Sequence, residues 1–174
     1  MAVFTYNKYL RQLLRQCECI LARDTAADYL GLTNGGQRNT VQIYVKKKQD
    51  VEGTEQIIVG SFEQIEYEMR CGLLCTTINQ TIVDLLEQGG DEQIITESLA
   101  NYYEKSGNTF EGLTISGYLK ERFEKYSSWA KVYIEKPLKN ILRSSGRNKK
   151  TIICALTVFA YFRYNEKKEA AYGY

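Results

Sequence analysis

The sequence has no histidine, a single proline and no apolar run long enough to span a membrane. Without histidine, the chain cannot hold a Ser-His-Asp or Cys-His catalytic site, or a zinc or haem bound by histidine. One proline in 174 residues excludes a long proline-rich linker. The longest mostly apolar run, 152–162, has 11 residues, whereas a membrane helix needs about 20. We therefore expect a buried helix there and no contact with a membrane.

Sequence motifs of nucleotide and acyl chemistry are also missing. There is no G-x-x-x-x-G-K-[ST], no G-x-G-x-x-G and no G-x-S-x-G. Acidic residues are frequent between positions 49 and 113 and would bind Mg²⁺ or Mn²⁺ if they converged in a cleft. Such runs are more often the solvated face of a helix, so we predict no enzyme, no catalytic residue, no metal and no cofactor. The candidate carboxylates are Glu63, Glu66, Glu68, Asp84, Glu87, Asp91 and Glu92.

Five cysteines, an odd number, occur in a chain whose start lacks the order of a signal peptide. This combination predicts free thiols and an intracellular protein, located in the cytoplasm, or in the host cytoplasm or virion if the protein is viral. Cys17 and Cys19, together with Cys71 and Cys75, match the ligand number of a four-thiolate zinc site. Their spacing differs from that of zinc ribbons, so small buried side chains are the favoured interpretation.

The net charge of +2 hides three segments of opposite sign. Residues 1–48 hold eight basic and three acidic residues, a net charge of +5. Residues 49–113 hold two basic and thirteen acidic residues, a net charge of −11, and residues 114–174 hold thirteen and five, a net charge of +8. Such charge can be neutralised within the fold, between copies of the chain head to tail, or by an anionic polymer on the basic side.

Apolar residues at spacings of three and four predict helices along most of the chain. The predicted helices cover residues 4–23 with a short continuation through Leu30, 62–88, the segment after Asp91, the segment from Thr114 that Pro137 kinks or restarts, and 150–170. Ser61 and Gln64 form a capping box for the helix 62–88. Gly72 is expected to kink or split this helix, and Gly89 with Gly90 to end it.

Two strands are predicted between the first two helices. Residues 41–45 alternate between apolar and polar side chains, the period of a strand, and 56–60 is a second candidate. Together they predict one β-hairpin, which is marginal alone and should pack on helices or pair with another chain. The predicted fold is mainly α, a helical bundle of five to six helices with one small β-hairpin at about 41–60. The predicted domain is 1–174, with an alternative division into lobes 1–60 and 61–174.

The loop 143–150 is basic and rich in small residues. It leads into the predicted helix 150–170, whose N-terminal amides favour an anion such as a nucleic-acid phosphate; an ordinary solvated loop is the alternative. Tyrosines among the C-terminal basic residues can stack on bases or anchor a protein interface. The predicted nucleic-acid-binding residues are Arg143, Arg147, Lys149, Lys150 and Arg163, and the tyrosines are Tyr126, Tyr133, Tyr161, Tyr164, Tyr172 and Tyr174.

Three C-terminal stretches allow one comparison with a known family. They are Tyr118-Leu119-Lys120, Tyr133-Ile134-Glu135-Lys136 and Ala160-Tyr161-Phe162-Arg163-Tyr164. This region, about 45 residues, resembles the end of the small helical subunits of type III CRISPR effector complexes. The resemblance implies a non-catalytic subunit that stacks along guide RNA and its target. Residues 1–110 have no counterpart in that family, and Pro137 falls where the family continues a helix.

These observations favour a non-enzymatic helical subunit of a larger assembly, such as a structural or accessory protein of a virus or mobile element. The alternative is a nucleic-acid-binding module that uses the basic C-terminal surface, such as a small helical subunit of a CRISPR-type ribonucleoprotein. An enzyme that uses the acidic residues with a divalent metal is the third hypothesis. We expect a protein partner or self-association, with nucleic acid as a second class of partner. The predicted interface residues are Lys46, Lys47 and Lys48, which would shield the hairpin edge, and Tyr172 and Tyr174.

Overall fold

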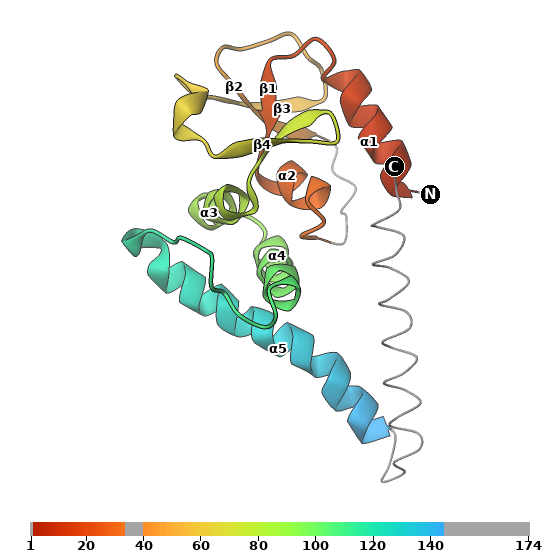
Figure 1. The fold of residues 1–174 in the computed structure, drawn as a ribbon, viewed down its shortest axis with the longest axis vertical. Coiled ribbons are helices and arrows are strands. Elements are labelled where there is room, and N and C mark those ends of the chain that lie inside the picture. Colours follow the sequence, from red (N-terminus) through yellow and green to blue (C-terminus); the bar gives the residue numbers. More distant parts are fainter. Residues whose placement is uncertain (1, 34–39, 145–174) are drawn as a thin grey trace. The chain divides into compact units, whose positions relative to one another are not determined.

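The fold is built on a five-stranded mixed sheet (Figure 1). Its strands are β1 (Cys19–Leu21), β2 (Val41–Val45), β3 (Thr54–Ile58), β4 (Tyr67–Arg70) and β5 (Leu73–Thr76), in the order β3-β2-β1-β5-β4. β1 lies in the middle, antiparallel to β2 and parallel to β5, while β3 is parallel to β2 and β4 is antiparallel to β5. The computed structural model describes residues 2–33 and 40–144, of which 2–6 and 135–144 are described by their backbone alone.

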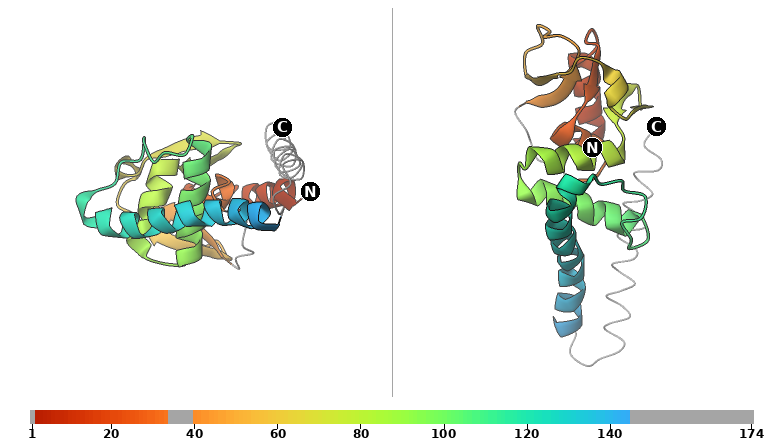
Figure 2. Two further views of the ribbon diagram at one scale, coloured as in Figure 1. Left: turned by 90° about the horizontal axis from the view of Figure 1, so that it is seen from below. Right: turned by 90° about the vertical axis from the view of Figure 1, so that its left-hand side faces the viewer.

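Five α-helices and two short 3-10 helices accompany the sheet in the part of the chain that the structure describes. They are α1 (Ala2–Leu13), α2 (Arg23–Tyr29), η1 (Phe62–Gln64), α3 (Ile78–Gln88), α4 (Glu92–Lys105), η2 (Gly117–Leu119) and α5 (Lys120–Ser144). α2 packs against β2 and α3, and α3 packs against β5 and α4. Figure 2 shows α3 and α4 as a layer between the sheet and the first turns of α5. The described residues up to Lys131 form one compact unit, and the rest of α5 belongs to a second unit.

The predicted mainly α bundle with one β-hairpin at about 41–60 is wrong, because the protein has an α/β fold. Both predicted strands exist, as β2 and β3, but they run parallel, with Val41 opposite Thr54. The connection 46–53 returns to the start of β2, where Val41 N donates to Gly53 O at 2.8 Å. Alternation of side chains indicates that a strand is present and does not indicate the direction of its partner.

The first predicted helix, 4–23, is also too long. α1 ends at Leu13, and the chain becomes extended in β1, where all three residues are buried. The apolar spacing has two origins, because Leu10 belongs to α1 and Ile20 to β1, and both are fully buried. A strand of three residues is too short to show its own period.

The predicted helix 62–88 is divided among η1, β4, β5 and α3. Ser61 caps only the single turn of η1, where its Oγ accepts a hydrogen bond from Glu63 N at 3.2 Å. Gly72 lies with Cys71 in the two-residue turn between β4 and β5, and both have positive φ angles, 83° and 43°. These angles are those of a type I′ turn, whose twist matches that of antiparallel strands. The hairpin of this protein is therefore β4–β5.

The helix boundaries predicted after residue 88 agree better with the structure. α3 ends at Gly89 in the left-handed conformation, as predicted. α4 begins after Asp91, whose Oδ1 accepts a hydrogen bond from Gln93 N at 2.9 Å, and this cap is also confirmed. α5 is uninterrupted at Pro137, so the predicted restart there is wrong, while the alternative of a kink stays a prediction; a proline removes one main-chain donor, and the neighbouring turns keep theirs. The predicted helix 150–170 lies outside the described residues.

No helix among residues 2–33 and 40–144 is long and apolar enough to cross a membrane.

We expect Cys71→Asn to stabilise the fold. A cysteine at a φ of 43° is strained, whereas asparagine tolerates the left-handed region and Asn-Gly is a preferred type I′ pair. The free energy of unfolding should rise by about 0.5–1 kcal/mol, as measured by urea denaturation. Cys71→Val is the matched control and should lower it, because a β-branched side chain is disfavoured at positive φ. The reverse order of the two variants would contradict the type I′ turn.

Candidate functional site

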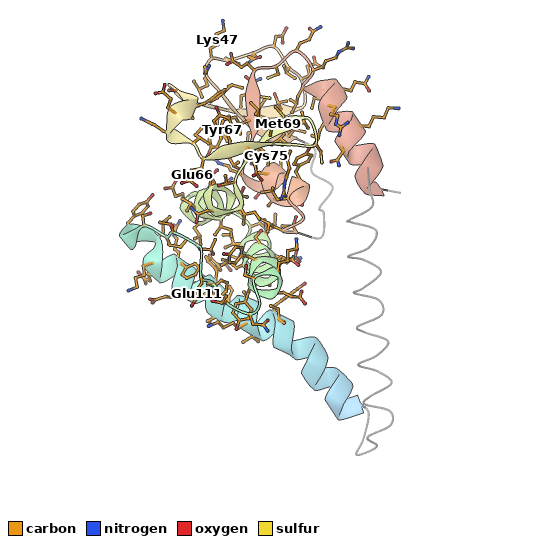
Figure 3. All side chains as sticks on the ribbon, viewed as in Figure 1. Lys47, Glu66, Tyr67, Met69, Cys75 and Glu111 are labelled. Atoms are coloured by element: carbon orange, nitrogen blue, oxygen red, sulfur yellow. The ribbon has the colours of Figure 1, made fainter. Side chains whose placement is uncertain are left out.

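β4 forms one edge of the sheet and is exposed along its whole length. Two of its residues are large and apolar: Met69 is 66% exposed and Tyr67 is 41% exposed (Figure 3). The unpaired main-chain groups of an edge strand are a template for pairing with another strand. β4 is therefore the strongest candidate interaction site in the part of the chain that the structure describes.

The hydrogen-bond register shows which main-chain groups of β4 are available for pairing. Thr77 N donates to Glu66 O at 2.9 Å, so Glu66 directs its main-chain groups toward the β5 side. This direction alternates along an antiparallel strand. Glu68 therefore also faces β5, while the N–H and C=O groups of Tyr67 and Met69 point away from the sheet.

Contacts at both ends hold β4 in its extended conformation. The ring of Tyr67 packs edge-on against Phe62, with 6.3 Å between the ring centroids. At the other end, the Tyr29 hydroxyl donates to Arg70 O at 2.6 Å. Between these ends, Arg70 Nε lies 3.4 Å from Glu68 Oε1 on one face of the strand. A strand that is already ordered loses less conformational entropy when a partner binds.

An apolar groove of about 460 Å³ lies beside β4. One wall is formed by the end of α1 and the segment that follows it, and the other wall by the β4–β5 hairpin. Its lining residues are Arg11, Leu14, Arg15, Cys17, Glu18, Cys19, Met69, Gly72, Leu73 and Leu74. The apolar side chains among them continue the exposed surface of Met69, so a partner strand at β4 would also meet apolar surface here.

The opposite edge strand, β3, is hydrogen-bonded to the segment that precedes it in the chain. Gln49 N donates to Gln56 Oε1 at 2.8 Å, and Gln56 Nε2 donates to Gln49 O at 2.8 Å. Ile58 is 62% exposed and lines a shallow groove of about 300 Å³ together with Lys48. β3 is thus a second open edge, with the segment that contains Gln49 bonded to it on one side.

One of the three lysines predicted as interface residues has its partners within the chain. Lys46 Nζ lies 2.6 Å from Glu18 Oε1 and 4.9 Å from the centroid of the Phe62 ring. The hydrogen bond with Glu18 raises the pKa of Lys46. Lys47 and Lys48 are exposed in the connection between β2 and β3. The interface role of these two lysines stays a prediction, but the hairpin that they were expected to shield is not there.

The predicted nucleic-acid site falls almost entirely outside the described residues. Arg143 lies in the last turn of α5, where only the backbone is described. The other residues predicted for this site or for the interface, Arg147, Lys149, Lys150, Arg163, Tyr172 and Tyr174, lie beyond the described part of the chain. Nucleic-acid binding at these residues therefore stays a prediction.

Tyr126, one of the tyrosines considered for base stacking, belongs to the core. It is buried, and its hydroxyl donates to Glu92 Oε1 at 3.0 Å. The neighbouring Lys125 Nζ lies 2.7 Å from the same Glu92 oxygen and 4.6 Å from the centroid of the Trp129 ring. These contacts join α4 to α5 and leave the Tyr126 ring no access to a base.

The acidic residues and cysteines do not converge into a metal centre in the described ranges. No group of three or more His, Cys, Asp or Glu side chains there could hold an ion. The four described cysteines are free thiols, as predicted. Burial raises the pKa of Cys75 to about 12 and also raises that of Cys19. Both thiols are therefore protonated at neutral pH and are poor nucleophiles.

Asp84, one of the carboxylates assigned to a solvated helix face, is buried instead. It is 4% exposed; Gln80 Nε2 donates to its Oδ1 at 2.7 Å, and its Oδ2 has no hydrogen-bond partner in the described structure. Burial raises the pKa of Asp84 to about 6, and hydrogen bonds with Gln80 and Tyr44 oppose this rise. The local sequence signal for this burial was the run of apolar neighbours Ile82, Val83, Leu85 and Leu86.

Comparisons with known proteins add no assignment to this geometry. No family model, no curated protein and no solved structure matches the chain.

The ionisation of Asp84 should make the fold less stable as the pH rises. The pKa of this carboxyl is about 6 in the folded state, above its ordinary value of 3.8. Its stabilising contribution is therefore complete below about pH 4 and is lost as the pH rises through about 6. Asp84→Asn keeps the side chain neutral throughout. The variant's free energy of unfolding minus that of the wild type should therefore grow by about 1–3 kcal/mol between about pH 4 and about pH 8. Urea denaturation at each pH measures this difference.

Asp91→Asn is the matched control for this measurement. Asp91 is exposed, and asparagine is as good an N-cap as aspartate. Its difference from the wild type should therefore show no such increase with pH. A difference between Asp84→Asn and the wild type that stays constant over the same pH range would contradict a buried, titrating carboxyl at this position.

Proposed function

We propose that the chain is a non-enzymatic subunit of a self-associating protein assembly, joined by β-strand addition at β4. The main support is the exposed edge Tyr67–Arg70, where the N–H and C=O groups of Tyr67 and Met69 point away from the sheet. A strand added at such an edge is held by main-chain hydrogen bonds and selected by alternating side chains. Because the sheet has two open edges in the described part of the chain, β3 and β4, a second copy can supply the added strand.

β4 has little of the protection that natural proteins give to edge strands. Such edges are commonly shielded by proline, by inward-pointing charges or by a covering loop. β4 contains no proline, and its two charged residues, Glu68 and Arg70, are paired with each other at 3.4 Å. Met69 stands between them with two thirds of its surface exposed. This combination supports a binding surface better than a protected edge.

The buried carboxyl and thiol groups support a catalytic function less well than β4 supports strand addition. The Asp84 carboxyl is buried among helix and sheet residues, and burial raises the pKa values of the Cys19 and Cys75 thiols. A catalytic acid, base or nucleophile needs access to its substrate as well as a suitable pKa. The geometry of these three residues therefore favours structural roles over catalysis.

The substitution Met69→Pro tests strand addition at β4. Proline lacks the N–H that Met69 directs away from the sheet, and proline is tolerated at edge positions of this kind. The ladder between β4 and β5 does not use that N–H, so the fold should persist. We expect the wild type to associate as its concentration rises. The dissociation constant of Met69→Pro should be at least about tenfold higher, as measured by light scattering after size exclusion.

Ile58→Pro is the matched control at the opposite edge. Ile58 is about as exposed as Met69, and its N–H also points outward, because the next residue, Val59, donates its N–H to Val45 O at 2.9 Å. This variant should associate as the wild type does when the strand added at β4 is a second β4, and more weakly than the wild type when the added strand is β3. A wild-type chain that is monomeric at every concentration would overturn the proposal. So would a Met69→Pro variant that is folded by circular dichroism and associates unchanged.

A further inference from the structure

The order of side chains along β4 is self-complementary. Glu68 and Arg70 flank Met69 and carry opposite charges. An antiparallel copy of the same strand presents these charges in reverse order. When the two copies are centred on Met69, each charge therefore lies opposite its counter-charge, which is a stabilising cross-strand pair.

The main-chain register agrees with this centre. The N–H and C=O groups of Met69 point away from the sheet. Two antiparallel copies of β4 that meet at Met69 would exchange both hydrogen bonds between their Met69 residues. Glu68 and Arg70 of opposite copies would then occupy the non-hydrogen-bonded positions, where the Cα atoms are about 4.5 Å apart and the side chains are closest.

The side chains on both faces of the two paired strands are compatible with this register. Glu68 and Arg70 lie on one face, and two copies would place their four charges there in alternation. On the other face, the two Met69 side chains would lie side by side. Met69 also lines the apolar groove of about 460 Å³, so a second methionine that arrives beside it meets further apolar surface.

The other open edge of the sheet is a poorer partner for β4. The residues of β3 that share a face with Glu68 and Arg70 are Thr54, Gln56 and Ile58, none of which is charged. A parallel pairing of β4 with β3 of another copy would therefore leave both charges without a cross-strand partner. An antiparallel pairing with Met69 opposite Gln56 would give a counter-charge, Glu55, to Arg70 alone, because Glu68 would lie opposite Ile57. Such head-to-tail contact continues from copy to copy into a ring or a filament, whereas a contact of β4 with β4 closes as a two-fold dimer.

We infer that a second copy of this chain binds at β4, antiparallel and with Met69 opposite Met69, so that the two sheets form one continuous sheet across a two-fold axis. This inference rests on the proposed function, and it adds the identity of the paired strand and its register.

Charge reversal on either side of Met69 tests this register. Glu68→Arg places like charges opposite each other at both symmetry-related positions, and Arg70→Glu does the same with the other sign. Each variant alone should have a dissociation constant at least about tenfold above that of the wild type in light scattering. An equimolar mixture of the two variants should associate again, because one copy then presents two basic residues and the other two acidic residues.

The double variant Glu68→Arg/Arg70→Glu is a second test, in which the ion pair within each strand is kept. It should associate as the wild type does, because unlike charges again face each other. Glu124→Arg is the matched control for the change in net charge: Glu124 is exposed on α5, and its reversal should leave association unchanged. Circular dichroism and thermal unfolding of each variant verify that the fold is retained.

The outcomes separate this inference from the proposed function. If Met69→Pro prevents association but neither the mixture nor the double variant restores it, strand addition at β4 stands and the two-fold register is overturned. If Ile58→Pro also prevents association, the added strand is β3 and the register is again overturned. If Met69→Pro has no effect, the proposed function fails, and this inference fails with it.

Discussion

The pairing of β1 with both of its neighbours is the constraint on which the rest of the fold depends. β1 has only three residues, all buried, yet it joins the β2–β3 half of the sheet to the β5–β4 half. Cys19 to Leu21 pair with β2, and Leu21 also lies opposite Cys75 of β5. Because buried main-chain groups need hydrogen-bond partners, loss of β1 would leave both halves with unpaired groups. The order of the distant edge strand β4 thus depends on these three residues.

The same pairing determines where the sheet is open. β5 uses one side for β1 and the other for β4, so the β4–β5 hairpin lies at the end of the sheet. The two-residue turn at Cys71 and Gly72 folds β4 directly back along β5. The hydroxyl of Tyr29 in α2 then holds the end of β4 through Arg70 O. The outward-facing groups of Tyr67 and Met69 are therefore a consequence of the topology of the whole sheet.

Local signals predicted the parts of the fold that local interactions decide. The Asp91 cap and the Gly89 stop involve residues within one turn, and both are correct. β1 was predicted as helix because its buried residues continue the apolar spacing of α1. β4 was also predicted as helix, because Met69 fits a helical spacing and the turn Cys71-Gly72 differs from the usual Asn-Gly pair. The alternation of apolar and charged residues along β4 was readable, but its edge position depends on strand order, which is non-local.

Folding brings some residues of the oppositely charged segments together, whereas the charges of β4 pair within the strand. Lys125 of the basic C-terminal segment pairs with Glu92 of the acidic middle, and Arg122 Nη1 donates to Leu86 O at the end of α3. Within the described residues, Arg70 of β4 pairs instead with Glu68 of the same strand. A strand shaped only to protect an edge would carry charge on both faces. β4 has charges on one face and Tyr67 and Met69 on the other, the alternation of a half-buried interior strand, and a second strand beside it would give it that environment.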